Sequence, residues 1–170
     1  KKDPGASTGT EESVTAPSTE VVAAGVSSAT PAGASNDKTH ELTGIAGWHA
    51  VYSGREGHAV RTWSPQAAFV LREGESVHPG VASSELSVGY TGDVRIVQPG
   101  KYRFAAEMKG GVATLAVYAG GRAVGSGELS PDQTSVETAW IDLPAGAVSV
   151  SVAFKRNGDG AARLRTMWER

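Results

Sequence analysis

The sequence contains no cysteine, and this absence excludes three kinds of chemistry. The chain can form neither disulfide bonds nor thiolate metal sites, and no thiol can act as a catalytic nucleophile. Long apolar runs are missing too. The longest one near the start, residues 21–26, is far shorter than the roughly 20 residues that a membrane-spanning helix needs. We therefore expect no membrane span in this segment.

A surplus of basic residues is also missing. The chain has 16 lysines and arginines against 18 aspartates and glutamates, which gives a formal net charge of −2 at pH 7. Proteins that bind nucleic acids or anionic membrane surfaces normally carry a basic face. The charge balance therefore argues against a nucleic-acid partner.

Aromatic residues are absent from the first 43 positions, although the chain has four Trp, four Tyr and three Phe. Residues 1–43 are rich in Ser, Thr, Ala, Gly and Pro, with six acidic side chains against three basic ones. Such a segment has little to bury and cannot recover the entropy that it would lose on ordering. It is predicted to be a low-complexity linker, or an arm that orders against a partner, followed by one domain at residues 44–170.

The first residue is Lys1 rather than methionine. A removed signal peptide, an upstream membrane anchor and a longer parent chain are all compatible with this start.

The strongest structural signal is the stretch at residues 86–106. Apolar and polar residues alternate on both sides of Gln98-Pro99-Gly100-Lys101, in which Pro and Gly occupy the positions typical of a type II turn. Alternation with a period of two indicates strands with one buried face. We therefore predict a β-hairpin whose turn lies at residues 98–101.

Similar alternating segments occupy most of the remaining domain. Turn residues recur about every 8–12 residues, and no segment of useful length has a helical period. The predicted fold class is all-β, an antiparallel β-sandwich, with a barrel as the alternative. The other predicted strands lie at residues 45–52, 60–63, 67–71, 112–118, 122–124, 136–143, 148–154 and 162–168.

No arrangement of catalytic residues is found in the sequence. Ser126 lies in Gly-Ser-Gly, which lacks the five-residue pattern of a nucleophile elbow. The four histidines, at positions 40, 49, 58 and 78, include no pair at metal-ligand spacing. The turn at residues 157–160 offers one carboxylate, too few for calcium. We expect no enzyme activity, no cofactor and no metal.

The aromatic residues divide into two groups. Trp140 and Trp168 lie on predicted strands in phase with apolar neighbours, so they are expected in the core. A second group lies nearer loops and strand edges, where an exposed ring can stack on a sugar or anchor a protein partner. These candidate surface residues are Trp48, Tyr52, Trp63 and Tyr118.

Several short motifs follow one another in a characteristic order over residues 44–169. They are Gly44-Ile45-Ala46-Gly47-Trp48, Tyr90-Thr91-Gly92, Pro99-Gly100-Lys101-Tyr102-Arg103-Phe104, Leu143-Pro144-Ala145-Gly146, the alternating segment 148–154 and the final segment 164–168. This order resembles the protective-antigen-type domain, a β-sandwich module of bacterial surface proteins, toxins, glycosidases and adhesins. The resemblance implies a β-sandwich that acts as an accessory or interaction module.

The resemblance also directs attention to one loop. Family members that bind sugar carry an acidic pair after the Tyr-x-Phe strand, where it holds calcium and the sugar hydroxyls. This chain has Glu107-Met108-Lys109-Gly110-Gly111 at that place, with a single acidic residue and a lysine. The difference favours a role without calcium, and it adds Glu107 and Lys109 to the candidate surface.

Together these observations predict a non-catalytic accessory or structural subunit that binds a protein partner in a larger extracytoplasmic assembly. The expected location is the periplasm or the cell surface, and the arm would contribute to docking. The alternative is a carbohydrate-binding module that acts through loop aromatics and the loop at residues 107–111. The two hypotheses differ in the expected partner, a protein in the first and a glycan in the second.

Overall fold

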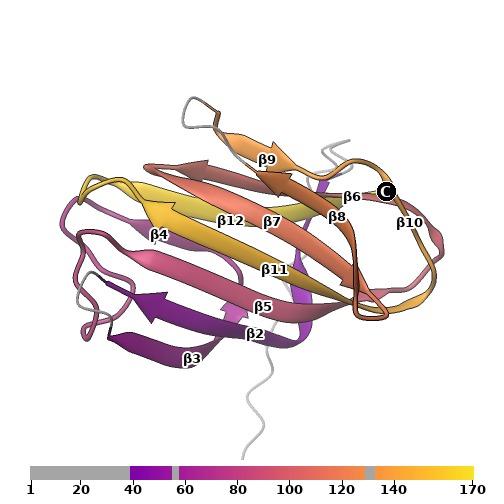
Figure 1. Cartoon of the computed structure of the whole chain (residues 1–170), viewed down its shortest axis with the longest axis horizontal. Helices are drawn as coiled ribbons and strands as arrows, with labels where there is room; N and C mark the ends of the chain where they lie inside the picture. Colours follow the sequence, from indigo (N-terminus) through magenta and orange to yellow (C-terminus); the bar gives the residue numbers. More distant parts are fainter. Residues whose placement is uncertain (1–38, 55–57, 129–132) are drawn as a thin grey trace, which may run out of the picture. The chain divides into compact units, whose positions relative to one another are not determined.

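Twelve antiparallel β-strands form the part of the chain that the computed structural model describes, residues 39–54, 58–128 and 133–170 (Figure 1). No helix occurs among these residues. The strands are arranged in two six-stranded sheets whose inner faces enclose the core. The predicted antiparallel β-sandwich is therefore confirmed.

The first sheet follows the order β1-β12-β6-β10, with β4 also paired to β12 and β9 also paired to β6. Every pairing in it is antiparallel. The strands are β1 (Thr39–Glu41), β4 (Phe69–Leu71), β6 (Gly100–Lys109), β9 (Ser135–Glu137), β10 (Ile141–Leu143) and β12 (Ala162–Glu169).

The second sheet has the order β3-β2-β5-β11-β7-β8 and is also antiparallel throughout. Its strands are longer, and β11 lies near its centre between β5 and β7 (Figure 1). They are β2 (Thr43–Ser53), β3 (Ala59–Gln66), β5 (Ser87–Ile96), β7 (Gly111–Ala119), β8 (Arg122–Glu128) and β11 (Gly146–Arg156).

Most consecutive strands lie in opposite sheets, and this corrects the predicted central hairpin. β5 pairs with β2 and β11 in the second sheet, whereas β6 pairs with β12, β9 and β10 in the first. The segment 97–99 therefore carries the chain across the sandwich instead of folding it back beside β5. Gly100 has an extended φ of 159° rather than the value near +80° of a type II turn.

The physical reason for the error is that alternation reports burial and not pairing. A strand shows the same period of two whether its neighbour along the chain lies beside it or across the core. The predicted hairpin at Gly120-Gly121 is confirmed, because β7 and β8 do pair and both glycines have positive φ, 55° and 77°. Two consecutive residues with positive φ are what a two-residue type I′ hairpin turn requires.

The described part of the sandwich begins with β1, which lies inside the range that the sequence assigned to the arm. β1 pairs with the end of β12, and Leu42 just after it is buried and donates its N–H to the Thr166 carbonyl oxygen at 3.2 Å. Residues 39–43 are thus part of the folded domain. The rest of the predicted arm, residues 1–38, lies outside the described residues, and its separate status stays a prediction.

The core is closed at one end by a buried arginine. Arg156, the last residue of β11, is 2% exposed, and its guanidinium group donates to main-chain carbonyl oxygens in two connecting segments, one between β4 and β5 and one between β11 and β12. A planar group with five N–H donors is suited to such a set of acceptors. The acceptors are the carbonyl oxygens of Arg72 (3.0 Å), Glu75 (2.7 Å), Ser83 (2.9 Å), Asp159 (2.7 Å) and Gly160 (2.9 Å from Nε).

We predict that Arg156→Met lowers the free energy of unfolding by about 3–5 kcal/mol, because several buried carbonyl groups lose their donors. The measurement is urea unfolding followed by tryptophan fluorescence. Arg163→Met, at an exposed position of β12, is the matched control and should change stability by less than about 0.5 kcal/mol. Equal midpoints for the two variants would show that the buried arginine does not hold these loops.

Candidate functional site

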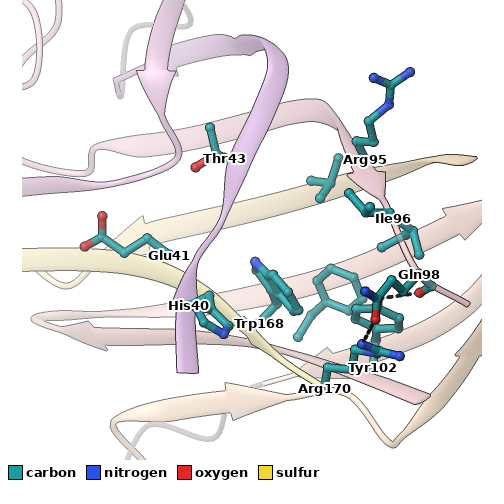
Figure 2. A pocket seen from close by; sticks show the side chains of 12 residues that line it. His40, Glu41, Thr43, Arg95, Ile96, Gln98, Tyr102, Trp168 and Arg170 are labelled. Carbon is teal, nitrogen blue, oxygen red and sulfur yellow. Dashed lines mark hydrogen bonds between the residues drawn. The ribbon is translucent and has the colours of Figure 1, made fainter. Parts of the chain in front are cut away.

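A cleft of about 460 Å³, here named the end cleft, opens where β12 finishes and the chain crosses from β5 to β6 (Figure 2). Its volume lies within the usual range of small-ligand sites. Strands of both sheets contribute to it. The lining residues are His40, Glu41, Thr43, Val94, Arg95, Ile96, Val97, Gln98, Tyr102, Phe104, Trp168 and Arg170.

Three rings form one wall of the end cleft. Trp168 continues the inward-facing row of β12, and the strand register places it beside His40 of β1. The ring centroids of this pair are 4.8 Å apart, and those of Trp168 and Tyr102 are 5.4 Å apart, with tilted planes in both cases. Because the sandwich ends here, Trp168 packs on the core with one part of its ring and lines the cleft with another.

Polar groups beside this wall are held in place by a chain of hydrogen bonds (Figure 2). The Tyr102 hydroxyl donates to the main-chain carbonyl oxygen of Gln98 at 2.5 Å. Arg170 donates to the side-chain oxygen of Gln98 and, at 3.5 Å, to the carbonyl oxygen of Pro99. The Nε2 group of Gln98 has no partner among the described residues, so it is available as a donor to a ligand.

The described lining of the end cleft holds two arginines, Arg95 and Arg170, but little negative charge. Glu41 is the one carboxylate in its described lining, and it pairs with Arg165 at 3.3 Å. Figure 2 shows Arg95 extending away from the aromatic wall. Glycoside hydrolysis commonly needs two carboxyl groups on opposite sides of the bond that is cleaved. The described lining does not supply such a pair.

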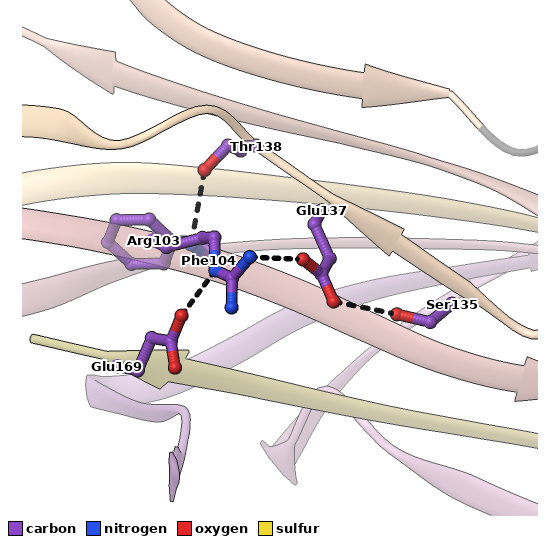
Figure 3. Close-up of polar contacts among 6 residues, drawn as sticks. All are labelled: Arg103, Phe104, Ser135, Glu137, Thr138 and Glu169. Atoms are coloured by element: carbon purple, nitrogen blue, oxygen red, sulfur yellow. Dashed lines mark hydrogen bonds and ion pairs between the residues drawn. The ribbon is translucent and has the colours of Figure 1, made fainter. Parts of the chain in front are cut away.

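A second cluster surrounds Arg103 on the outer face of the first sheet (Figure 3). Arg103 pairs with Glu137 of β9 at 2.7 Å and with Glu169 of β12 on its other side. The hydrogen bond to Glu169 raises the pKa of Arg103, so the guanidinium group stays protonated. It also lies over the ring of Trp140, 5.3 Å from the centroid. The cluster therefore links β6, β9 and β12, and the charge of Arg103 is already paired with two carboxylates.

Trp140 lies on this outer face because of a β-bulge, and its predicted place in the core is wrong. Glu137 pairs with Ala105, and Ile141 pairs with Tyr102. The segment from β9 to β10 therefore advances by four residues where β6 advances by three. The extra residue divides the predicted strand 136–143 into β9 and β10. A bulge re-aims side chains, and Trp140 is 51% exposed as a result.

Thr138 replaces the ladder hydrogen bonds that the bulge disrupts (Figure 3). Its side-chain Oγ1 accepts from the Phe104 N–H at 3.1 Å, and its own N–H donates to the Phe104 carbonyl oxygen at 2.9 Å. Thr138 is buried, so these partners are shielded from water. This pair of hydrogen bonds makes the bulge a defined feature of the sheet.

Two of the six candidate surface residues belong to the core, which corrects their prediction. Trp48 is completely buried, and its ring lies so close to Gly92 that a Cβ atom there would come within 2.8 Å. Tyr52 is also buried, edge-on to Tyr90 at a centroid distance of 6.3 Å. An irregular register in β2 before Trp48 weakens the alternation in the sequence, so the buried phase of this strand was missed.

The other four candidate residues lie on two different sheets and do not form one site. Trp63 on β3 and Tyr118 on β7 are 67% and 37% exposed and share the outer face of the second sheet. Glu107 and Lys109 both belong to β6 in the first sheet, where Glu107 is half-buried and Lys109 is exposed. They lie toward the end of β6 opposite the end cleft.

The residues that line the end cleft were missed as a group by sequence reasoning. Trp168 was expected in the core, and His40 was treated as an isolated histidine of the arm. One signal was present: Trp168 is followed directly by Glu169-Arg170, which indicates that the buried face of the last strand ends there. Nothing in the sequence pointed to Gln98 beyond its place in a turn.

Neither a metal cluster nor a membrane-spanning helix is found in the described residues. No three His, Asp or Glu side chains among them lie close enough together to hold a metal ion. None of their segments forms a helix that is long and apolar enough to cross a bilayer.

In the loop at residues 107–111, Gly110 has a φ of 76° and packs against the main chain of Ala161.

No protein-family model and no curated protein matches the chain by sequence. Solved structures are similar to it. The Epithelial Adhesin 6 A domain (Epa6A) from Candida glabrata, in complex with Galb1-3GlcNAc, covers 76% of this chain and 85% of its own, with a TM-score of 0.53 and 9% identity. The PA14 sugar-binding domain from RTX adhesin covers 75% and 90%, with a TM-score of 0.45 and 16% identity. The similarity to the Epa6A domain is one of fold.

We predict that Thr138→Val destabilises the protein by about 1–3 kcal/mol, because the buried Phe104 N–H loses its acceptor while the shape of the side chain is kept. Thr138→Ser retains the hydroxyl group and should cost no more than about 1 kcal/mol for the lost methyl group. Urea unfolding of both variants measures the difference. A serine variant as unstable as the valine variant would contradict a role for the hydroxyl group.

Proposed function

We propose that this protein is a non-catalytic β-sandwich domain that binds carbohydrate in the end cleft. The observation that carries the proposal is the aromatic wall of Trp168 and Tyr102 beside the free amide donor of Gln98. A sugar ring has an apolar face of C–H groups and an edge of hydroxyl groups. A site for it therefore needs an aromatic surface with polar groups at its margin.

The geometry of the end cleft meets this requirement in a preorganised form. Trp168 is in contact with both His40 and Tyr102, so its ring does not need to be ordered when a ligand binds. Gln98 is anchored by Arg170. Binding costs less free energy when the site is already ordered.

The fold is compatible with such a role. The adhesin domain that shares it was solved in complex with a disaccharide. The sequence alone favoured a protein partner and placed carbohydrate second; the end cleft is the reason for reversing that order. The resemblance to the protective-antigen-type domain and an extracytoplasmic location, in the periplasm or at the cell surface, are further parts of this proposal.

The proposed site differs from the one that the resemblance indicated. The loop at residues 107–111 lies at the other end of β6 from Tyr102 and Phe104. Since the described residues give the end cleft a single carboxylate, which is already paired with Arg165, we expect sugar binding there to be independent of calcium.

The first test is a glycan array probed with the whole chain, with calcium and with a chelator. We expect the same set of glycans to be bound in both conditions. Silence of the array in both conditions would overturn the proposal.

For any glycan that binds, we predict that His40→Ala weakens the affinity roughly twofold to tenfold, because Trp168 loses the ring that supports it. Gln98→Ala removes the free donor and should have an effect of similar size. Isothermal titration calorimetry measures both.

The matched control is His49→Ala. His49 also lies against a tryptophan, edge-on to Trp63 at 5.7 Å, but on the outer face of the second sheet. It should leave glycan affinity unchanged. Equal losses for the two histidine variants, or none for either cleft variant, would exclude the end cleft as the binding site.

A further inference from the structure

The outer face of the second sheet has an ordered arrangement of side chains that the proposed glycan site does not use. Paired residues on neighbouring antiparallel strands project from the same face, so the strand register defines rows across all six strands. One row reads Arg61, Val51, Gly89, Ala153, Thr114 and Glu128 from β3 to β8. The next reads Trp63, His49, Thr91, Ser151, Ala116 and Ser126.

These rows are asymmetric in both size and charge. The β3 edge carries the long side chains Arg61 and Trp63, whereas the β8 edge carries Glu128 and the small Ser126. Trp63 is 67% exposed, and its ring is held edge-on by His49. Neither Arg61 nor Glu128 forms an ion pair with another described residue. Trp63, the largest apolar side chain of these two rows, is therefore mostly exposed.

The centre of the face is made of small side chains. Gly89 and Ala153 pair in one row, and Thr91 and Ser151 pair in the next. A depression of about 520 Å³ lies over part of this region, with Glu128 in its lining. Within these two rows no large side chain stands on β5 or β11, so a second flat surface can approach closely there; the adjoining rows carry Lys155 of β11 and Tyr118 of β7.

We infer that a second copy of this chain covers the face, related by a two-fold axis that runs parallel to the strands between β5 and β11. Such an axis places the β3 edge of one copy opposite the β8 edge of the other. Each row of one copy then faces the same row of the other copy. Arg61 then lies opposite Glu128 of the other copy. Trp63 lies opposite Ser126 of the other copy.

The match holds along both rows and depends on the register. The positive edge meets the negative edge twice, once on each side of the axis. In this arrangement Arg61 meets the oppositely charged Glu128 of the other copy, and Trp63 meets the small Ser126. The small residues of β5 and β11 in these rows meet those of the other copy. An isologous interface needs this kind of self-complementarity. Two sheets packed face to face with nearly aligned strands are also a common arrangement.

The available area is sufficient for a specific dimer. Six strands spaced about 4.8 Å apart, with roughly eight residues each at a rise of about 3.3 Å, give a face on the order of 600 Å². Two copies would bury about 1,200 Å² in total, which reaches the lower range of stable interfaces. This interface does not include the aromatic wall of the end cleft, so the two proposals are tested separately.

The test is sedimentation velocity of the whole chain over a wide range of concentrations. We expect a reversible monomer–dimer equilibrium that weakens as salt is added, because charge pairs contribute to it. Arg61→Glu and Glu128→Arg each place like charges opposite each other at two points, so each variant alone should dimerise more than tenfold more weakly. Arg163→Glu, on the other sheet, should dimerise as the unmodified chain does.

An equimolar mixture of the two charge variants gives the sharpest result. In a mixed dimer, the two negative positions of one variant meet the two positive positions of the other, so association should return to the level of the unmodified chain. Recovery cannot be explained by misfolding of either variant. Each fold is checked by circular dichroism before mixing.

Three outcomes would overturn the inference. One is an unmodified chain that stays monomeric at every concentration. A second is single variants that dimerise normally, and the third is a mixture that does not recover. A monomeric chain whose glycan affinity falls on Trp63→Ala would assign the face to a sugar ligand instead.

Discussion

The structure depends on the way in which Arg156 satisfies the loops at one end of the sandwich. A guanidinium group at the end of β11 binds main-chain carbonyl groups from the long segment before β5 and from the turn before β12. Without these donors the carbonyl groups would be buried without partners, which is costly for each of them. One long side chain therefore fixes two segments that have little regular structure of their own.

At the opposite end of the sandwich, the described residues provide no such closure. There the chain crosses from β5 to β6, and β12 finishes with Trp168 facing the gap between the sheets. The side chains that would fill this gap instead line it.

The four tryptophans show how differently the fold uses one residue type. Trp48 fills the core, and Trp168 is shared between the core and the end cleft. Trp140 is turned outward by a bulge and covered by Arg103, whereas Trp63 is exposed on an edge strand. One residue type thus fills the core, lines a cleft and stands on the outer faces of both sheets.

Local patterns in the sequence were sufficient for the fold class and for most strands. Period-two alternation located β11 and β12, and paired glycines located the turn between β7 and β8, because these signals depend only on neighbouring residues. The same alternation did not reveal that β5 and β6 lie in opposite sheets. The bulge at Thr138 was hidden for a similar reason, since its cost is offset by a partner more than 30 residues away.

The candidate site was beyond local reasoning altogether. His40, Gln98, Tyr102 and Trp168 come from separate parts of the chain and meet only where four strands end together. By itself, the sequence determined that this chain is all-β and antiparallel, with a sandwich favoured over a barrel, and which faces are buried in the regularly alternating strands such as β11 and β12. The tertiary structure decided which strands are neighbours, which aromatic rings stay exposed and where the sandwich is open, because these depend on contacts between residues far apart in the chain.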